Sequence, residues 1–310
     1  MPSIYSILAA TTAVGLLLLA GWILLYTFKF TDIGTTRFHA VPVVLFCSSL
    51  LLMSLALFYT DKFYRYNPLH VTFILVCISC PFALKVLIRT RKGHNNFMLA
   101  VAAMMCIWLC KFFYGIPMFE VLPLNICNLI TCMLIIRPFY KNKILDNYIL
   151  PFAFCGSVAN VMAGGDYHTS FFYIETFETN IIHHSFMAIS LYMLLTREVE
   201  LDVKTAAKNY YWILPYFVLM IFLNNYFKFN YFYTSKYENP LLGIYNLFPT
   251  FDLNLFNFAF EINLGYYLVL LSGIIIVHLS LTKIFAKIQK EVVYQPAYAL
   301  APLAEYNIYK

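Results

Sequence analysis

The residues of this chain with the clearest chemical potential are one cysteine and two adjacent histidines. Cys127, His183 and His184 all lie inside strongly apolar segments. A cysteine beside a histidine can act as nucleophile and base, because the thiolate attacks and the imidazole accepts its proton. The structural alternatives are a small packing side chain for the cysteine and a hydrogen bond between helices for the histidines. The residues alone leave both interpretations open.

Several asparagines accompany these three residues in the neighbouring apolar segments. Asn180 precedes His184 by one helical turn, and Asn128 falls on the same predicted helix face as Cys127. An asparagine can orient an imidazole or stabilise an oxyanion. The candidate supporting residues are Asn125, Asn128, Asn160, Asn180 and Asn225.

These polar residues need a scaffold, and the composition indicates a membrane protein. The chain is 62% hydrophobic and 12% charged, which leaves too little polar surface to cover a soluble domain. Apolar runs of about 20 residues recur, the length that crosses about 30 Å of hydrocarbon. Because backbone groups in lipid must pair within their own segment, we expect helices. The predicted fold class is all-α, a polytopic transmembrane helix bundle.

We predict nine spans in a chain of three parts. Residues 1–67 hold two added N-terminal transmembrane helices, residues 68–290 form a seven-helix core, and residues 291–310 form a cytoplasmic tail. The predicted spans are roughly 4–27, 40–60, 69–88, 96–115, 119–139, 146–164, 177–196, 209–227 and 262–286.

The distribution of Lys and Arg predicts the orientation of the bundle. Most of these residues fall in loops on one side, among them Arg89, Arg137, Arg197 and Lys283, and this side is expected to be cytoplasmic. The N-terminus then lies outside and the C-terminus in the cytoplasm, and we expect the plasma membrane. The positive charge needs no nucleic acid to explain it, because it sits in loops that set topology.

On this topology the candidate residues share one depth. Span five enters the membrane from outside near Phe119, which places Cys127 about 12 Å along the helix. Span seven enters near Phe177, which places His184 about 10 Å along its own helix. The polar residues of the last five spans thus gather in the outer half of the bilayer. The cytoplasmic halves are expected to hold no comparable set.

The longest connection, residues 228–261, is expected on the outer side and is rich in Tyr and Phe. Aromatic rings of this kind favour the headgroup interface. The segment is either an interfacial loop or a lid over a lipid-facing site. If it is a lid, its aromatic side chains pack onto the outer ends of spans five, seven and eight.

The remaining cysteines and histidines predict no cofactor and no metal site. Cys77 and Cys80 are expected to be packing residues, because no thioredoxin-like context surrounds them. His278 is expected to make a contact between helices. Four histidines fall at predicted loop positions and are expected to be solvated: His39, His70, His94 and His168.

The stretch Leu122-Pro123-Leu124-Asn125-Ile126-Cys127 resembles the LPLHLC signature of the YwaF-type bacterial integral membrane protein family. That family in turn resembles the transmembrane protein 164 acyltransferase family. His184-Ser185, an Asn-rich span eight and a Pro- and aromatic-rich outer segment follow in the same order, and the similarity covers about residues 68–286.

The resemblance implies acyl transfer between phospholipids through a cysteine acyl-enzyme. The matching nucleophile is Cys127 and the matching histidine is His184. The histidine of the signature is Asn125 here. If that histidine acts in the chemistry, this chain is a degenerate and inactive member.

Three functions follow from these observations. The first is a membrane-embedded lipid acyltransferase or lipid hydrolase that acts on a phospholipid or lysophospholipid through Cys127 and one of the two histidines. The second is a non-enzymatic subunit or scaffold with a protein partner in a membrane complex, which Asn125 and the two added spans favour. A transporter ranks last, because repeated halves and buried charge are not evident in the sequence.

Overall fold

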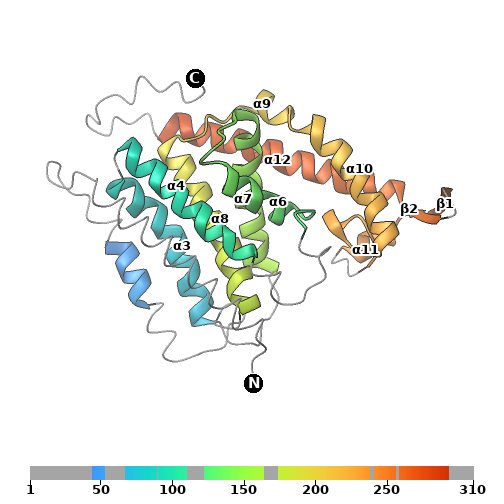
Figure 1. Cartoon of the computed structure of the whole chain (residues 1–310), viewed down its shortest axis with the longest axis horizontal. Helices are drawn as coiled ribbons and strands as arrows, with labels where there is room; N and C mark the ends of the chain where they lie inside the picture. The colour runs from blue at the N-terminus through green and yellow to red at the C-terminus, as the bar shows by residue number, and fades with distance from the viewer. Residues whose placement is uncertain are drawn as a thin grey trace.

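The computed structural model describes residues 44–52, 67–88, 90–109, 122–163, 174–237, 241–255 and 258–292. Within these ranges the chain is mainly helical (Figure 1), which confirms the predicted helical membrane bundle. The predicted span 4–27 lies outside the described residues. Of the predicted span 40–60, only residues 44–52 are described, and they are helical.

The helices match most of the predicted spans of the core in order and approximate bounds. The main helices are α3 (Pro68–Leu87), α4 (Arg91–Met105), α6 (Ile126–Ile136), α7 (Lys143–Ala163), α8 (Ile174–Thr196), α10 (Tyr210–Phe227) and α12 (Leu264–Val292). The shorter elements are α9 (Val203–Ala207), the 3-10 helix η2 (Tyr231–Tyr233), α11 (Leu242–Tyr245), β1 (Phe251–Leu255) and β2 (Phe258–Ile262).

Four of the described helical segments are long and apolar enough to cross a membrane by length and composition. They are Pro68–Leu87, Lys143–Val161, Val203–Phe227 and Leu264–Lys290. Local sequence signals set where two of the helices begin. Asn67 accepts a hydrogen bond from the backbone N–H of His70 at 2.8 Å, with Pro68 at the first position of α3. Thr90 caps α4 in the same way.

The helices α3, α4, α6, α7 and α8 pack into one bundle. The α8 helix lies along both α3 and α7, while α6 packs on α4 and α7. The core between them is apolar and aromatic, and five of its buried side chains are Met105, Leu134, Tyr148, Phe186 and Tyr192. This bundle positions both Cys127 on α6 and His184 on α8.

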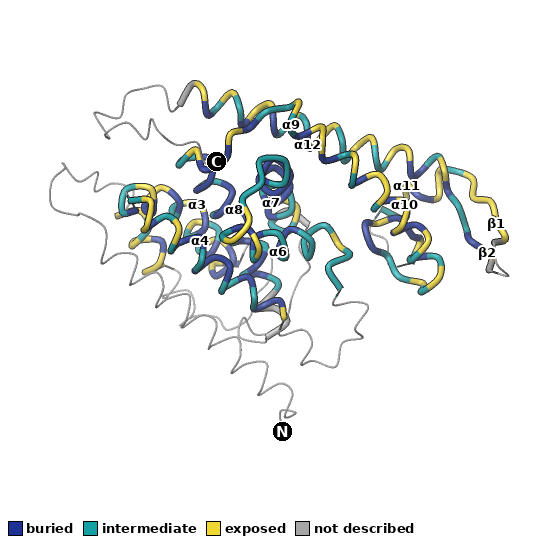
Figure 2. Tube along the Cα trace, turned by 45° about the horizontal axis from the view of Figure 1, so that its top comes forward, coloured by how far each residue is buried: buried dark blue, intermediate teal, exposed yellow. Residues whose placement is uncertain are grey.

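The helices α10 and α12, with the segment between them, extend to one side of the bundle, and we call this part the arm (Figures 1 and 2). The arm has its own aromatic core, which includes Phe217, Tyr231, Phe232, Tyr245 and Tyr266. Two strands, β1 and β2, lie at its far end and pair antiparallel. The predicted outer loop therefore contains a hairpin that the sequence analysis missed.

One buried histidine joins the arm to the bundle. His278 on α12 has Nδ1 2.8 Å from the Tyr210 hydroxyl of α10 and Nε2 2.8 Å from the Asn147 carbonyl oxygen of α7. The carbonyl can only accept, so Nε2 carries the proton and Tyr210 donates to Nδ1. The expectation of a contact between helices for His278 is confirmed.

A buried ionic cluster ties four segments together at the opposite end of α6 from Cys127. The Arg137 guanidinium donates from Nε to Asp146 Oδ1 at 2.6 Å and from Nη2 to Asp146 Oδ2 at 3.2 Å. Its Nη1 donates to Glu198 Oε1 at 3.1 Å. Glu198 also pairs with Lys141 at 3.1 Å and with His94 at 2.5 Å. We call these five residues the Arg137 cluster.

This cluster corrects three expectations. The half of the bundle predicted to be cytoplasmic does hold a polar set, and charge is buried there, since Arg137, Asp146 and Glu198 are all buried. His94 is not a solvated loop residue, because it lies in the first turn of α4 and pairs with Glu198.

His70 was also predicted to be a solvated loop residue, and this was wrong, since it lies buried in the first turn of α3. His39 and His168 fall outside the described residues.

Removing Arg137 should cost far more stability than removing a nearby exposed lysine. Arg137→Met leaves Asp146 buried without its bidentate partner, so we expect the free energy of unfolding to fall by about 3–5 kcal/mol. The matched control is Lys143→Met, which breaks an ion pair with the exposed Glu200 and should cost at most about 1 kcal/mol. Unfolding in detergent micelles measures both, and equal losses would contradict a dominant role for the cluster.

The Arg137 cluster also predicts a pH dependence. Burial opposes ionisation of Glu198, but the hydrogen bond and charge of His94, with the charges of Arg137 and Lys141, lower its pKa from 4.5 to about 2. A lowered pKa stabilises the fold above pH 4.5 and loses this effect as the pH falls towards 2. The stability difference between the unchanged protein and Glu198→Gln should therefore shrink over this window. A pH-independent difference would contradict the assignment.

Candidate functional site

Cys127 lies in the first turn of α6, close to the backbone of α7. The helix begins directly after the Leu-Pro-Leu-Asn stretch, with Asn125 at the cap position. The Cys127 sulfur is 3.6 Å from the point where a Cβ on Gly156 would stand. The missing side chain at Gly156 therefore leaves space next to the thiol, inside the partly buried margin of the main core.

Two tyrosines lie within electrostatic range of the thiol. They are Tyr148 of α7 and Tyr233 of the arm. Tyr148 is buried, whereas Tyr233 is 46% exposed. Sequence analysis missed both residues. For Tyr233 no local signal exists, because its position depends on the turn after α10.

That turn has a strained backbone that asparagine holds in place. Phe232 and Tyr233 both have a φ of 58°, a left-handed conformation that costs a non-glycine residue about 1–2 kcal/mol. The buried Asn224 side chain donates to the Tyr231 carbonyl oxygen at 2.6 Å and accepts from the Tyr231 N–H at 2.8 Å. The Tyr266 hydroxyl donates to the Tyr233 carbonyl oxygen at 2.7 Å. These bonds hold the backbone of the turn at Tyr231 and Tyr233.

His184 lies on α8, and its side chain is buried against α3. Its ring lies 5.4 Å from the His70 ring and 4.8 Å from the Phe73 ring, measured between centroids. Its Nδ1 is 3.0 Å from the Asn180 carbonyl oxygen one turn earlier. Because a carbonyl only accepts, we assign the proton to Nδ1, and Nε2 is the basic nitrogen. The Asn67-Pro68 helix start is the signal that could have placed His70 in this group.

His183 has the same arrangement on a less buried face of α8. Its Nδ1 is 2.8 Å from the Thr179 carbonyl oxygen, which again leaves Nε2 as the basic nitrogen. Its ring lies 5.8 Å from the Phe186 ring. Either histidine could therefore accept a proton at Nε2, and they differ in the side of α8 that they occupy.

Cys127 and His184 lie at the same level of the bundle, on helices that both pack against α7. The α7 and α8 helices run antiparallel, and the Ser190 hydroxyl of α8 donates to the Leu150 carbonyl oxygen of α7 at 3.2 Å. Six residues further along α7 is Gly156, and six residues back along α8 is His184, so each lies about 9 Å from that contact. The His184 ring contacts the rings of His70 and Phe73 on α3, whereas the Cys127 sulfur lies next to Gly156 of α7. A hydrogen bond between the two residues stays a prediction.

The five candidate asparagines occupy different places. Asn180 is buried and orients His184 through its carbonyl. The Asn125 side chain accepts a hydrogen bond from the Phe232 N–H at 3.4 Å, which joins the start of α6 to the arm. Asn225 accepts one from the Glu261 N–H at 2.8 Å, which joins α10 to β2 within the arm. Asn128 donates to the Leu122 carbonyl oxygen at 3.4 Å. Asn160 is half-buried on α7.

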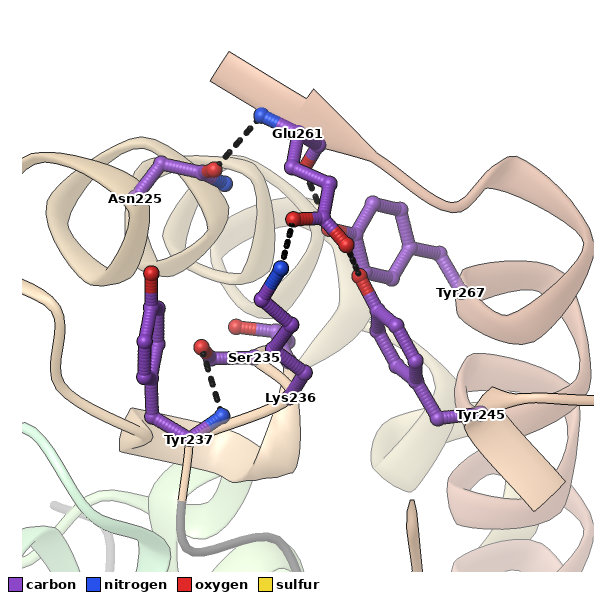
Figure 3. Close-up of a pocket in the computed structure, with 8 residues that line it drawn as sticks. Asn225, Ser235, Lys236, Tyr237, Tyr245, Glu261 and Tyr267 are labelled. Carbon is purple, nitrogen blue, oxygen red and sulfur yellow. Dashed lines mark hydrogen bonds and ion pairs between the residues drawn. The ribbon is translucent and has the colours of Figure 1, made fainter. Parts of the chain in front are cut away.

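A small polar pocket opens in the arm, with about 180 Å³ of empty space including its mouth (Figure 3). Lys236 reaches across it to a Glu261 carboxylate oxygen, and Tyr245 donates to the other oxygen at 3.3 Å. The hydrogen bond to Glu261 raises the pKa of Lys236. Asn225 closes one wall, so this candidate residue belongs to the pocket and not to the surroundings of His184.

Comparison with known proteins gives a family match over most of the chain. The model of the TMEM164 family matches residues 4–283. No curated protein and no solved structure among those compared matches the chain. The sequence similarity was expected over about residues 68–286, so the match adds the segment that holds the first two predicted spans.

The contact between Gly156 and Cys127 predicts a selective effect on the thiol. A methyl group on Gly156 would stand at ordinary van der Waals distance from the sulfur. Gly156→Ala should therefore keep or raise the stability, by up to about 1 kcal/mol from helix propensity, while slowing alkylation of Cys127. Peptide mapping by mass spectrometry after reaction with an apolar maleimide measures the rate.

The control is Gly273→Ala on α12, where an added Cβ meets nothing within 4 Å. Both variants gain the same helix propensity, but only the first fills space at the sulfur. An unchanged alkylation rate in Gly156→Ala, or equal slowing in both variants, would contradict this placement of Cys127.

Proposed function

Because the chain belongs to the TMEM164 family and is an integral membrane protein, we propose that it is a lipid acyltransferase or lipid hydrolase that works through Cys127 and His184. One observation carries the proposal. Methyl-sized room at Gly156 lies beside the Cys127 sulfur, and the basic Nε2 of an oriented histidine lies about as far along the bundle. The resemblance of the Leu122–Cys127 stretch to an acyltransferase signature agrees with this choice of nucleophile.

The proposed reaction has two steps in which the proton is conserved. The Cys127 thiol gives its proton to Nε2 of His184, and the thiolate attacks an ester carbonyl of a phospholipid. The carbon–oxygen bond breaks, a thioester forms, and the leaving lysophospholipid takes the proton from the imidazole. The hydroxyl of a second lysophospholipid then gives its proton to Nε2 and attacks the thioester. The carbon–sulfur bond breaks, a new ester forms, and the imidazole returns the proton to the Cys127 sulfur. Water in place of that hydroxyl gives hydrolysis.

The supporting residues have separate roles in this proposal. The Asn180 carbonyl holds the Nδ1–H of His184, so the ring presents Nε2 as the base. The oxyanion needs donors that point at it before the reaction, and the Tyr233 hydroxyl and the Asn128 amide are the candidates. His183 is the second candidate base, with the same assigned tautomer.

The site is proposed to face the outer leaflet of the plasma membrane, with the N-terminus outside. This orientation rests on the Lys and Arg distribution, which assigns the end of the bundle with Arg137 to the cytoplasm. Cys127 lies at the opposite end of α6 and therefore in the outer half of the bilayer. The donor and acceptor lipids would be phospholipids and lysophospholipids of that leaflet.

A second candidate function is a non-enzymatic subunit or scaffold in a membrane complex. The observation that favours it is the side chain of Asn125, which stands where the related signature has histidine. Here Asn125 holds the Phe232 N–H and has a structural role. A purified protein without acyl transfer but with a stoichiometric protein partner would support this alternative.

Substitutions at the proposed pair should remove activity without unfolding the protein. Cys127→Ala should abolish acyl transfer to lysophospholipid in proteoliposomes, because no thioester can form. His184→Gln should reduce the rate by about 10²–10⁴-fold, the usual contribution of a general base. Cys132→Ala, on the same helix and also partly buried, is the matched control and should keep full activity. Undiminished transfer by folded Cys127→Ala would reject the proposal.

A further inference from the structure

The hairpin of β1 and β2 has one apolar face and one polar face. The cross-strand pairs Phe251–Ile262, Leu253–Phe260 and Leu255–Phe258 alternate with Asp252–Glu261 and Asn254–Ala259. Successive side chains of a strand point to opposite faces. Phe251, Leu253, Phe260 and Ile262 therefore share one face, which we call the apolar face.

Among the side chains of this face that the structure describes, those of β2 are more covered by protein than those of β1. The Phe260 ring contacts the Phe222 ring of α10 at 5.5 Å between centroids, and Phe260 is buried. On β1, in contrast, Phe251 is 51% exposed and Leu253 is 39% exposed. Figure 2 shows β1 as exposed and β2 as partly buried at the far end of the arm.

The uncovered residues continue the outward surface of a helix that spans the membrane. Leu214, Val218 and Phe222 follow one another at intervals of four along α10, and all three are exposed. Phe222 then touches Phe260, whose cross-strand partner is Leu253. The apolar surface of α10 thus runs without a break onto the hairpin.

The other face and the outer edge of the hairpin require water or headgroups. The like charges of Asp252 and Glu261 stand opposite one another, and Lys236 pairs with Glu261 on that face. The outer edge of β1 carries backbone groups that cannot enter hydrocarbon unpaired. The hairpin can therefore insert its apolar side chains only shallowly, with its polar face and edge at headgroup level.

We propose that this hairpin is an interfacial membrane-inserting element whose Phe251 and Leu253 side chains lie among the acyl chains of one leaflet. The partner is the lipid itself, because the exposed side chains extend the surface that α10 already presents to lipid. An isolated two-stranded hairpin is marginal in water, and immersion of the apolar face supplies the packing that β1 lacks. This inference does not depend on any catalytic role of Cys127.

Photocrosslinking from alternate positions of β1 tests the proposal. The photoreactive amino acid p-benzoylphenylalanine is placed singly at positions 251, 252, 253 and 254 of the full chain, reconstituted in phosphatidylcholine vesicles with alkyne-tagged acyl chains. We expect lipid adducts from 251 and 253 in several-fold higher yield than from 252 and 254. Positions 252 and 254 are the matched controls, because they lie on the same strand with opposite facing.

A second measurement protects the test against a hairpin that the bulky probe disturbs. The added fluorescence of Leu253→Trp should be quenched by brominated acyl chains, whereas that of Asn254→Trp should not. Equal lipid adducts or equal quenching from both faces would overturn the proposal. Crosslinks from 251 and 253 to a second copy of the chain, or to another part of the same chain, would also overturn it.

Discussion

The bidentate pair between Arg137 and Asp146 joins the end of α6 to the start of α7, and the rest of the bundle depends on that junction. Only six residues separate the two helices, so the chain reverses tightly, and the pair holds this reversal through two hydrogen bonds. Arg137 also binds Glu198, which joins the segment after α8 to this junction. Glu198 in turn pairs with His94, in the first turn of α4. A buried ion pair is weak evidence for added stability, because desolvation offsets most of the attraction. Its effect here is to select one arrangement, since a misplaced helix would leave a buried charge unpaired.

This junction determines where the thiol can lie. Arg137, which caps α6, lies ten positions after Cys127, a rise of about 15 Å along a continuous helix. With one end held at Asp146, the first turn of α6 lies beside α7 at Gly156, where an added Cβ would stand 3.6 Å from the Cys127 sulfur. His184 reaches the same level through α8, which the Glu198 contacts hold at the same junction. The positions of Cys127 and His184 along the bundle are thus both determined by the contacts of the Arg137 cluster at its opposite end.

The helices could be predicted from the sequence because lipid permits few other structures, and the caps at Asn67 and Thr90 follow ordinary rules. The Arg137 cluster could not be predicted, because its members are far apart in the chain. In the sequence each of them is typical of a charged loop residue that sets topology or faces water. The hairpin was missed although its signal is present: Phe-Asp-Leu-Asn-Leu and Phe-Ala-Phe-Glu-Ile alternate with the period of two expected for strands. The positions of Cys127 and His184 along their helices could be estimated by counting residues, and their depth in the bilayer stays a prediction. Their orientation could not be estimated, since it depends on how α6 and α8 pack around α7.

The first turn of α6 lies between the bundle and the arm, and its connections to the arm are few and specific. Asn125 accepts from the Phe232 N–H, and the Tyr216 hydroxyl of α10 donates to the Pro123 carbonyl oxygen at 3.0 Å. The strained turn at Phe232 and Tyr233 contains the residue that Asn125 binds. Hydrogen bonds from Asn224 and Tyr266 stabilise this turn. A displacement of α10 would therefore act first on this turn and on the residues that precede Cys127. The side chain at position 125 thus connects the arm to the helix turn that carries the thiol. A histidine at this position could keep that link through Nδ1 or Nε2 while adding a titratable group, whereas asparagine keeps the link and adds none.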